Sequence, residues 1–235
     1  MTLDETVHAE LIGVAHQLAD AARPETLRNF RAPALVTYDK GGEDFDPVTV
    51  ADRSAEKAMR AVLERERPDD AILGEEFGET EGSSGLTWVL DPIDGTRGYI
   101  SGTPTWGVLI SVADKTGPLF GLIDQPYIGE RFAGGFGVAE VHGPLGHSVL
   151  TCRKDRNLYE ATVLTTFPEV GTAAEGAAFH AVASQAKLTR YGMDCYGYAL
   201  LAAGQVDLVI EAGLNPYDIH APIAVVMAAG GVVTD

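Results

Sequence analysis

The chain has 235 residues, of which 46% are hydrophobic and 22% are charged. This composition is typical of a globular protein, and the length suits one or two domains with a buried core. Lys and Arg number 17 against 34 Asp and Glu, so the formal net charge is −17. Because nucleic acids and anionic lipids attract basic surfaces, this charge argues against both as partners.

The two cysteines, Cys152 and Cys195, show no CxxC spacing, and two cysteines cannot build a disulfide framework. A reducing compartment is the simplest interpretation. No apolar run approaches the roughly 18 residues of a membrane helix. The acidic first residues, MTLDE, lack the basic and then apolar layout of a signal peptide. We therefore expect a cytoplasmic protein with no membrane partner.

Hydrophobic periodicity predicts two helices early in the chain. The first is expected over residues 3–22 and ended by Arg23-Pro24, and the second over residues 49–67 and ended by Pro68. Residues 31–48 between them are polar and glycine-rich, which predicts a loop or a mobile hairpin. Residues 77–86 read as a polar turn region. Short strands are expected over residues 71–73, 88–90, 106–112, 119–123 and 131–134, the last three as a meander.

A Gly/Pro/His stretch at residues 142–148 is the best candidate boundary. We therefore divide the chain into residues 1–142, an α+β half with the metal and phosphate site, and residues 143–235, an α/β half. Together they would form one compact unit, with antiparallel strands in the first half and mixed strands in the second. Strands are expected over residues 161–166, 188–191, 206–210 and 231–234, and helices over residues 173–185, 196–203 and 219–229.

Acidic residues follow the ends of the predicted strands. Glu75 and Glu76 come after one strand, Asp91 and Asp94 come after the next, and Asp218 lies far along the chain at a predicted helix start. A buried carboxylate without a partner is energetically expensive, and few bases lie nearby in the sequence. Hard divalent cations bind oxygen ligands and would neutralise these acids. The pattern therefore indicates a metal site.

The turn after the second strand supports this interpretation. Pro92 fixes one backbone angle, so that Asp91, Asp94 and the carbonyl of Ile93 can point to one place. Gly95 allows close backbone approach. If a helix starts there, its free N–H groups form an anion site. Cations beside an anion site suit phosphoryl chemistry.

Each piece alone is a common cap or solvated turn, but the combination is specific. The chain resembles the inositol monophosphatase-like family of metal-dependent phosphatases, from the helix start at residues 48–52 to Asp235. The segments that carry the resemblance are Gly74-Glu75-Glu76, residues 90–96, Tyr217-Asp218 and residues 229–231. The resemblance implies an α/β fold, the αβαβα sandwich of inositol monophosphatases and fructose-bisphosphatases. Residues 121–126, 130–131, 191–196 and 206–218 are most similar to histidinol-phosphate phosphatases.

The resemblance also implies a cofactor, Mg²⁺, with two or three ions per site and Mn²⁺ as the alternative. Glu75, Asp91 and the carbonyl of Ile93 would bind the first ion. Asp91, Asp94 and Asp218 would bind the second.

Further roles follow from the resemblance. The amides of Gly95 and Thr96 would hold the phosphate, and Glu75 with the Thr96 hydroxyl would orient and deprotonate the attacking water. Asp52 would lie behind Thr96 and share a further, weaker cation. Because Thr49 and Asp52 are spaced like a helix-capping pair, Asp52 is a cap, a site residue or both.

Three residues are candidates for substrate binding. Glu211 matches the family's contact to a substrate hydroxyl or amine. Asp194 is a second acid for a substrate ammonium, or else a surface acid. Arg97 would help neutralise the phosphate, or it faces solvent.

We therefore expect a homodimeric phosphomonoesterase of small phosphorylated metabolites that uses a metal-activated water without a phosphoenzyme. L-histidinol phosphate is the first candidate substrate, and inositol 1-phosphate or another sugar or nucleotide phosphate is the alternative. A non-catalytic metal- or ligand-binding regulator is the rival of another class. A haloacid-dehalogenase-like phosphatase fits less well, because one residue separates the two acids of its motif whereas Pro92-Ile93 makes two here.

Three features depart from the family pattern. Arg97-Gly98-Tyr99 stands where a continuation like Thr-Asn-Phe is more common. Asp218 is followed by Ile219-His220 where two alanines are usual, and the chain stops at Asp235, where family members continue through another strand and a helix. The histidines at positions 8, 16, 142, 147, 180 and 220 show no paired zinc spacing such as His-x-x-x-His.

Overall fold

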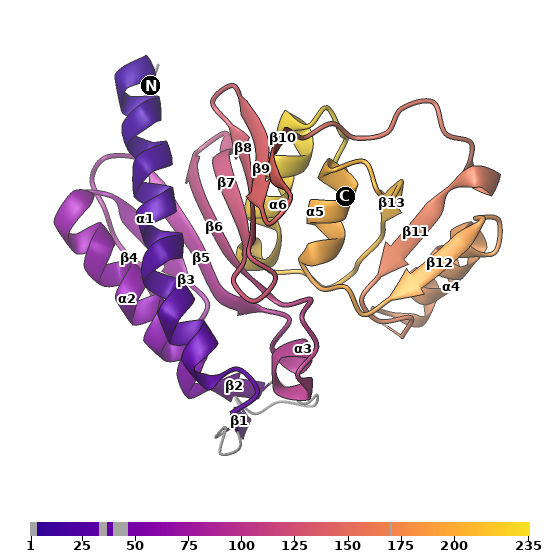
Figure 1. Ribbon diagram of the computed structural model, residues 1–235, viewed down its shortest axis with the longest axis horizontal. Coiled ribbons are helices and arrows are strands. Elements are labelled where there is room, and N and C mark those ends of the chain that lie inside the picture. Colours follow the sequence, from indigo (N-terminus) through magenta and orange to yellow (C-terminus); the bar gives the residue numbers. More distant parts are fainter. Residues whose placement is uncertain (1–3, 33–36, 40–46, 170) are drawn as a thin grey trace.

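The computed structural model describes residues 4–32, 37–39, 47–169 and 171–235. Its helices and sheets form five layers (Figure 1). Two helices cover one face of an eight-stranded sheet, two more lie between it and a three-stranded sheet, and one lies beside the small sheet at the far end. This αβαβα arrangement confirms the predicted fold class. The helices are α1 (Glu5–Asn29), α2 (Val50–Glu66), α3 (Thr96–Ser101), α4 (Ala173–Ala183), α5 (Tyr196–Ala202) and α6 (Pro216–Ala228), with a 3₁₀ turn at Leu158–Glu160.

The large sheet has the strand order β10-β9-β8-β7-β6-β5-β3-β4. Strands β3 and β5 are parallel and all other neighbours are antiparallel, so the expectation of a purely antiparallel first half is wrong at this one pair. Strand β4 lies within the predicted turn region at residues 77–86. The strands are β3 (Ala71–Gly74), β4 (Gly78–Thr80), β5 (Thr87–Asp94), β6 (Gly107–Asp114), β7 (Gly117–Gln125), β8 (Glu130–Gly135), β9 (Val138–Gly143) and β10 (Gly146–Val149).

Two hydrophobic clusters hold the large sheet between its helices. Helices α1 and α2 bury Leu11, Leu18 and Met59 against Trp88 and Phe120 of the sheet. On the opposite face, α5 and α6 pack in a second cluster. The spacing of apolar residues predicted α1 and α2, and helices with one apolar face can cover a sheet.

Helix α1 continues past Pro24 to Asn29, so its predicted end at Arg23-Pro24 is wrong. A proline within a helix removes one backbone hydrogen bond, and other contacts compensate here. Arg23 donates to buried Asp124 on β7 at 2.7 Å, and the Tyr99 hydroxyl donates to the carbonyl of Thr26 at 2.6 Å. The predicted start at residue 3 lies outside the described residues. Among the helices of the described segments, none is long and apolar enough to cross a membrane.

The predicted boundary stretch at residues 142–148 contains sheet structure. Strands β9 and β10 form a hairpin there that extends the large sheet at its edge. Strand β10 is exposed along its length and β9 is mostly half-buried, so neither shows the alternation of buried apolar and exposed polar residues that predicted the earlier strands. The division into residues 1–142 and 143–235 remains a prediction.

The small sheet has the order β12-β11-β13, with β11 at Thr162–Thr165, β12 at Leu188–Tyr191 and β13 at Leu208–Val209. All its pairs are parallel, so the expected mixed sheet is wrong. The reason lies in the connections, because α4 and α5 each carry the chain back to the same end of the sheet.

Two further predicted segments, residues 231–234 and residues 31–48, can be compared with the structure. The expected strand at residues 231–234 is absent, because the Gly231 amide turns back to the carbonyl of Val226 at 2.9 Å and closes α6. In the predicted loop or hairpin at residues 31–48, β1 (Thr37–Asp39) and β2 (Pro47–Thr49) pair antiparallel. Residues 33–36 and 40–46 of that segment lie outside the described residues.

Candidate active site

The strand order brings the first acidic residues to one edge of the large sheet. Strands β3 and β5 are parallel neighbours, with Gly74 opposite Leu90, so Glu75 leaves β3 beside Asp91 of β5. The Glu75 amide donates to the carbonyl of Leu90 at 3.2 Å. The register of β5 against β6 shifts between Asp91 and Asp94. Such a bulge re-aims side chains, and here it lets both aspartates face the same region.

Asp218 completes the group from the other end of the chain. It lies in the first turn of α6, and carboxylate oxygens of Asp91, Asp94 and Asp218 lie within 4.8 Å of one another. Glu75 joins them, because its carboxyl is hydrogen-bonded to that of Asp91. The structure thus brings together the four acids that the sequence singled out as metal ligands.

Burial and mutual repulsion change the titration of these acids. The pKa of Asp91 is raised well above its ordinary value, first by burial and then by Glu75, Asp94 and Asp218. The pKa of Asp94 is raised for the same first reason and then by Asp194 and Asp218. Buried acids this close together ionise readily only when a cation lies among them. Their all-oxygen donor set fits Mg²⁺ or Mn²⁺.

Asp94 also connects β5 to the start of α5. Its Oδ2 accepts a hydrogen bond of 2.6 Å from the amide of Cys195, directly before α5. The Gln125 side chain donates in turn to the Cys195 sulfur at 3.4 Å. Sequence reasoning missed both contacts, because they depend on how segments distant in the chain meet.

The turn at Gly95 has the backbone conformation that the sequence predicted. Gly95 has φ +83°, in the left-handed region that favours glycine, and α3 begins directly after it. A Cβ atom there would lie 2.6 Å from the Asp194 carboxyl carbon. The Thr96 hydroxyl donates to the carbonyl of Ile93 at 3.1 Å, and the Ile93 amide donates to Asp91 Oδ1 at 3.0 Å.

Asp52 caps helix α2 and also touches the site. Its Oδ2 accepts from the Thr49 amide at 2.9 Å, which confirms the predicted capping pair. Its Oδ1 lies 3.5 Å from the Thr96 hydroxyl. Burial raises the pKa of Asp52 to about 6, with a smaller upward contribution from Glu76, although hydrogen bonds from Thr49 oppose the shift.

Glu56 supports the site and was not predicted. It is fully buried on α2, where its carboxylate accepts from the amides of Glu76 and Phe77 at 2.7 and 3.3 Å and from Arg60 at 2.8 Å. These bonds fix the turn that carries Glu75. The sequence did contain one signal for Glu56, which is a glutamate on the apolar face of a predicted helix.

The candidate substrate residues lie on the side of the small sheet. Glu211 follows β13, and its Oε1 accepts from the amide and hydroxyl of Thr166 at 2.7 and 2.9 Å. Asp194 is half-buried and accepts from Thr105 at 2.7 Å, so it is not a surface acid. Burial is the main cause that raises the pKa of both carboxyls. Arg97 is exposed, with its guanidinium 5.1 Å from the centre of the Phe167 ring.

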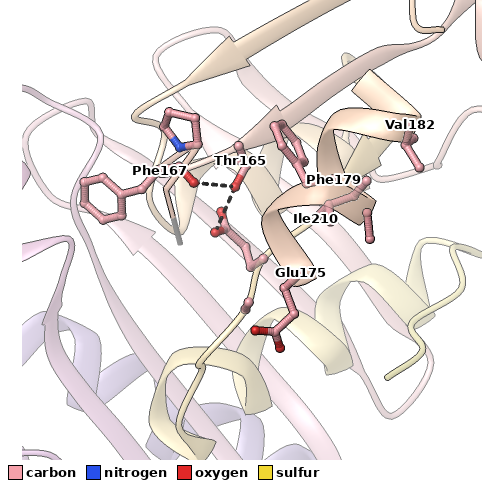
Figure 2. Close-up of a pocket in the computed structure, with 10 residues that line it drawn as sticks. Thr165, Phe167, Glu175, Phe179, Val182 and Ile210 are labelled. Atoms are coloured by element: carbon pink, nitrogen blue, oxygen red, sulfur yellow. Dashed lines mark hydrogen bonds between the residues drawn. The ribbon is translucent and has the colours of Figure 1, made fainter. Parts of the chain in front are cut away.

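A pocket of about 240 Å³ adjoins Glu211, between the small sheet and α4. Figure 2 shows Phe167 and Phe179 on either side of Thr165, whose hydroxyl lies 3.3 Å from Glu211 Oε2. Val182 and Ile210 supply further apolar wall. The pocket therefore has apolar walls and the Glu211 carboxylate in its lining.

The fold and these carboxylates together define a layered α/β protein with a candidate divalent-metal centre at the edge of its large sheet. Comparison with protein families agrees, because the model of the inositol monophosphatase family matches residues 8–235. The chain belongs to this family. Enzymes of the family use divalent metals, typically Mg²⁺.

Individual relatives of this chain carry different enzyme names. The chain is 41% identical to the bifunctional phosphatase IMPL2, chloroplastic, of Arabidopsis thaliana, over 99% of this chain and 66% of that protein, just under two thirds of its length. It is 33% identical to a histidinol-phosphatase of Chlorobaculum parvum, over 94% of this chain and 84% of that protein. A solved inositol monophosphatase from Zymomonas mobilis superposes with a TM-score of 0.80 at 38% identity, covering 93% of this chain and 83% of that one.

Proposed function

We propose that this chain is a metal-dependent phosphomonoesterase that hydrolyses L-histidinol phosphate to L-histidinol, a step of histidine biosynthesis. The observation that carries the reaction type is the convergence of Asp91, Asp94 and Asp218 within 4.8 Å, beside the Gly95 turn. The choice of substrate is argued from Glu211, Asp194 and the pocket beside the small sheet. The relatives named phosphatase and histidinol-phosphatase support both parts.

Glu75, Asp91, Asp94, Asp218 and the carbonyl of Ile93 would hold two or three Mg²⁺ ions. When bound, such cations lower the pKa of water and neutralise the charge of the phosphate. Apart from these ions, the chain supplies positioning, which dominates phosphoryl transfer.

The residues around the Gly95 turn would handle the reacting groups. The amides of Gly95 and Thr96 hold the phosphate oxygens. The Thr96 hydroxyl, backed by Asp52, orients the attacking water, and Glu75 accepts its proton. Water attacks phosphorus directly while the bond from phosphorus to the ester oxygen breaks. L-histidinol leaves after its oxygen takes a proton from solvent, inorganic phosphate remains, and the protein itself is not phosphorylated. Arg97 at the start of α3 adds positive charge near the phosphate.

Substrate choice follows from charge. Histidinol phosphate carries an ammonium and an imidazole ring, whereas inositol phosphates carry only hydroxyl groups on the leaving side. Glu211 and Asp194 offer two carboxylates for the ammonium, and the pocket lined by Phe179 and Val182 offers an apolar wall for the ring. An inositol phosphate would leave both acids without a cationic partner.

A panel of phosphate esters tests the substrate. The full chain is assayed with Mg²⁺ on L-histidinol phosphate, inositol 1-phosphate, fructose 1,6-bisphosphate and 3′-phosphoadenosine 5′-phosphate. We expect kcat/KM to be highest for histidinol phosphate. A preference for inositol 1-phosphate would favour the alternative substrate, which the Zymomonas mobilis structure supports by its name. Equal rates would remove the specific claim and leave the reaction class.

The reaction type has its own test. Asp91→Asn should lower Mg²⁺-dependent hydrolysis by at least about 10³-fold, because it removes a charge shared by both proposed cation positions. Asp114→Asn, which changes an exposed acid on β6, is the matched control and should leave the rate unchanged. Metal binding without turnover of any ester in the unmodified chain would favour the non-catalytic regulator. The homodimer and the cytoplasmic location remain predictions, and light scattering in solution tests the first.

A further inference from the structure

The hairpin at the edge of the large sheet carries two histidines that the fold brings face to face. His142 on β9 and His147 on β10 are direct partners in the strand register. Glu140 lies two residues before His142, and side chains two apart on a strand share a face. The chain turns between Gly143 and Gly146, so a spacing that matches no zinc motif becomes a cross-strand pair.

The three side chains already lie at short distances. His142 Nε2 is 3.2 Å from Glu140 Oε1, and His147 Nε2 is 3.0 Å from Glu140 Oε2. The two imidazole rings have centroids 4.5 Å apart. One ligand atom from each residue lies within 4.8 Å of the other two. Tetrahedral ligands about 2.0–2.2 Å from a metal are separated by roughly 3.4 Å, so small side-chain rotations suffice to place an ion among them.

We propose that Glu140, His142 and His147 form a second metal site, which binds a borderline transition-metal ion such as Zn²⁺. Two imidazole nitrogens and one carboxylate are typical Zn²⁺ ligands, whereas Mg²⁺ prefers oxygen alone. Both histidine side chains are about half exposed, at 56% and 50%. The fourth coordination position is therefore open to water.

The surroundings of the site suit a cation. Burial acts to raise the pKa of Glu140, but hydrogen bonds from His147 and His142 outweigh it and hold the pKa below its ordinary value. The residue thus offers a carboxylate near neutral pH. Arg131 on β8 is the direct register partner of His142 on β9, but its guanidinium is paired with Asp124 at 2.7 Å and Asp20 at 2.8 Å.

The ion would also connect strands. Strand β10 is exposed along its length and pairs only with β9. A metal held by Glu140 and His142 of one strand and His147 of the other would fasten this edge strand to the sheet. Because the unfolded chain does not hold the three residues together, the ion would stabilise the folded hairpin.

Zn²⁺ binding to the full chain tests the proposal. The protein is kept in saturating Mg²⁺, which occupies the oxygen-rich centre, and Zn²⁺ is titrated against a chromophoric chelator. We expect one Zn²⁺ per chain, with affinity lowered at least about tenfold in His142→Ala and in His147→Ala. His180→Ala, an exposed histidine on α4, is the matched control and should bind as the unmodified chain does.

Hydrogen exchange gives a second readout that does not depend on activity. Zn²⁺ should slow amide exchange in β10 of the unmodified chain and of Asp91→Asn, but not of His147→Ala. No saturable Zn²⁺ binding, equal binding by the His147→Ala variant, or loss of binding in Asp91→Asn would overturn the proposal. The last result would place the ion among the acids of β5.

Discussion

At the scale of single residues, the main feature is a set of acids that the fold makes difficult to ionise. Asp91 is buried and Asp94 is half-buried beside other carboxyls, and both have a raised pKa. A raised pKa means that, without a metal, these carboxyls keep their protons to a higher pH than an isolated aspartate does. Cation binding and proton release are therefore linked.

This linkage predicts that Mg²⁺ binding near pH 7 releases protons. A cation favours the ionised acids, so Mg²⁺ affinity should rise as pH rises and protons compete less. Calorimetric titration in two buffers of different ionisation enthalpy measures the number released. Asp91→Asn should release fewer protons. Binding whose heat is the same in both buffers would show that these acids are already ionised without the metal.

A second prediction concerns Glu211 and rests on the proposed substrate. Glu211→Gln keeps an oxygen that can accept from Thr166 but removes the negative charge. Because a hydrogen bond to a charged group contributes about 1.5–3 kcal/mol, KM for histidinol phosphate should rise about 10- to 100-fold. KM for p-nitrophenyl phosphate, which has no ammonium, should change little.

Glu175→Gln is the matched control, since Glu175 lines the same pocket but is exposed on α4. A similar rise in KM for both esters would mean that Glu211 supports the shape of the site and does not bind the ammonium.

At the scale of elements, α2 and α6 each begin at the site and use a site acid to fix their first turn. Asp52 accepts from the backbone of Thr49 at the start of α2, and Asp218 accepts from the amide of Asn215 at 2.6 Å at the start of α6. Capping thus fixes the two carboxylates before any cation binds. This explains how residues distant in sequence reach one place with little freedom.

Substitutions at Asp218 should separate the two roles. Asp218→Asn keeps an oxygen for the Asn215 amide, so the melting temperature should stay close to that of the unmodified chain while hydrolysis is lost. Asp218→Ala removes the capping bond too and should cost about 1 kcal/mol of stability in addition. Calorimetry and an activity assay on both variants measure this. Equal melting temperatures for the two variants would show that the capping bond contributes nothing measurable.

At the scale of the whole molecule, the net charge of −17 opposes the compact state, and the buried acids concentrate that effect. A cation that binds only the folded chain stabilises it in proportion to the logarithm of its concentration. The proposed metal centre should therefore be visible in the stability of the entire protein.

We predict that Mg²⁺ at about 100 times its dissociation constant stabilises the metal-free chain by about 2.7 kcal/mol. For a chain of this size, that raises the melting temperature by about 5–10 °C. NaCl at the same ionic strength is the control and should raise it less, since it only screens charge. If Asp91→Asn responds to Mg²⁺ as fully as the unmodified chain, the stabilisation comes from general screening.

Local patterns predicted most elements, and contacts between distant segments account for the errors. The strand before Asp91 and the turn at Pro92 are local features, so the sequence revealed them. The continuation of α1 past Pro24 depends on Asp124 of another strand, which no local pattern contains. Strand β10 lacks apolar alternation because it is the exposed edge strand of the large sheet.

The candidate site divides in the same way. Glu75, Asp91 and Asp94 belong to recognisable motifs, and the parallel pairing of β3 and β5 explains why they meet. Glu56 was missed because it acts through the backbone of Glu76. The amide of Cys195 was missed because its partner, Asp94, lies 101 residues earlier in the chain.

Asp218 caps α6 and is also a proposed metal ligand, and this combination has a practical consequence. Because an amide at this position can still cap the helix, the variant should keep the shape of the site and lose its activity. A chain carrying Asp218→Asn would then retain an intact ester long enough for crystallography. The identity of the molecule captured that way would report the natural ligand without any turnover.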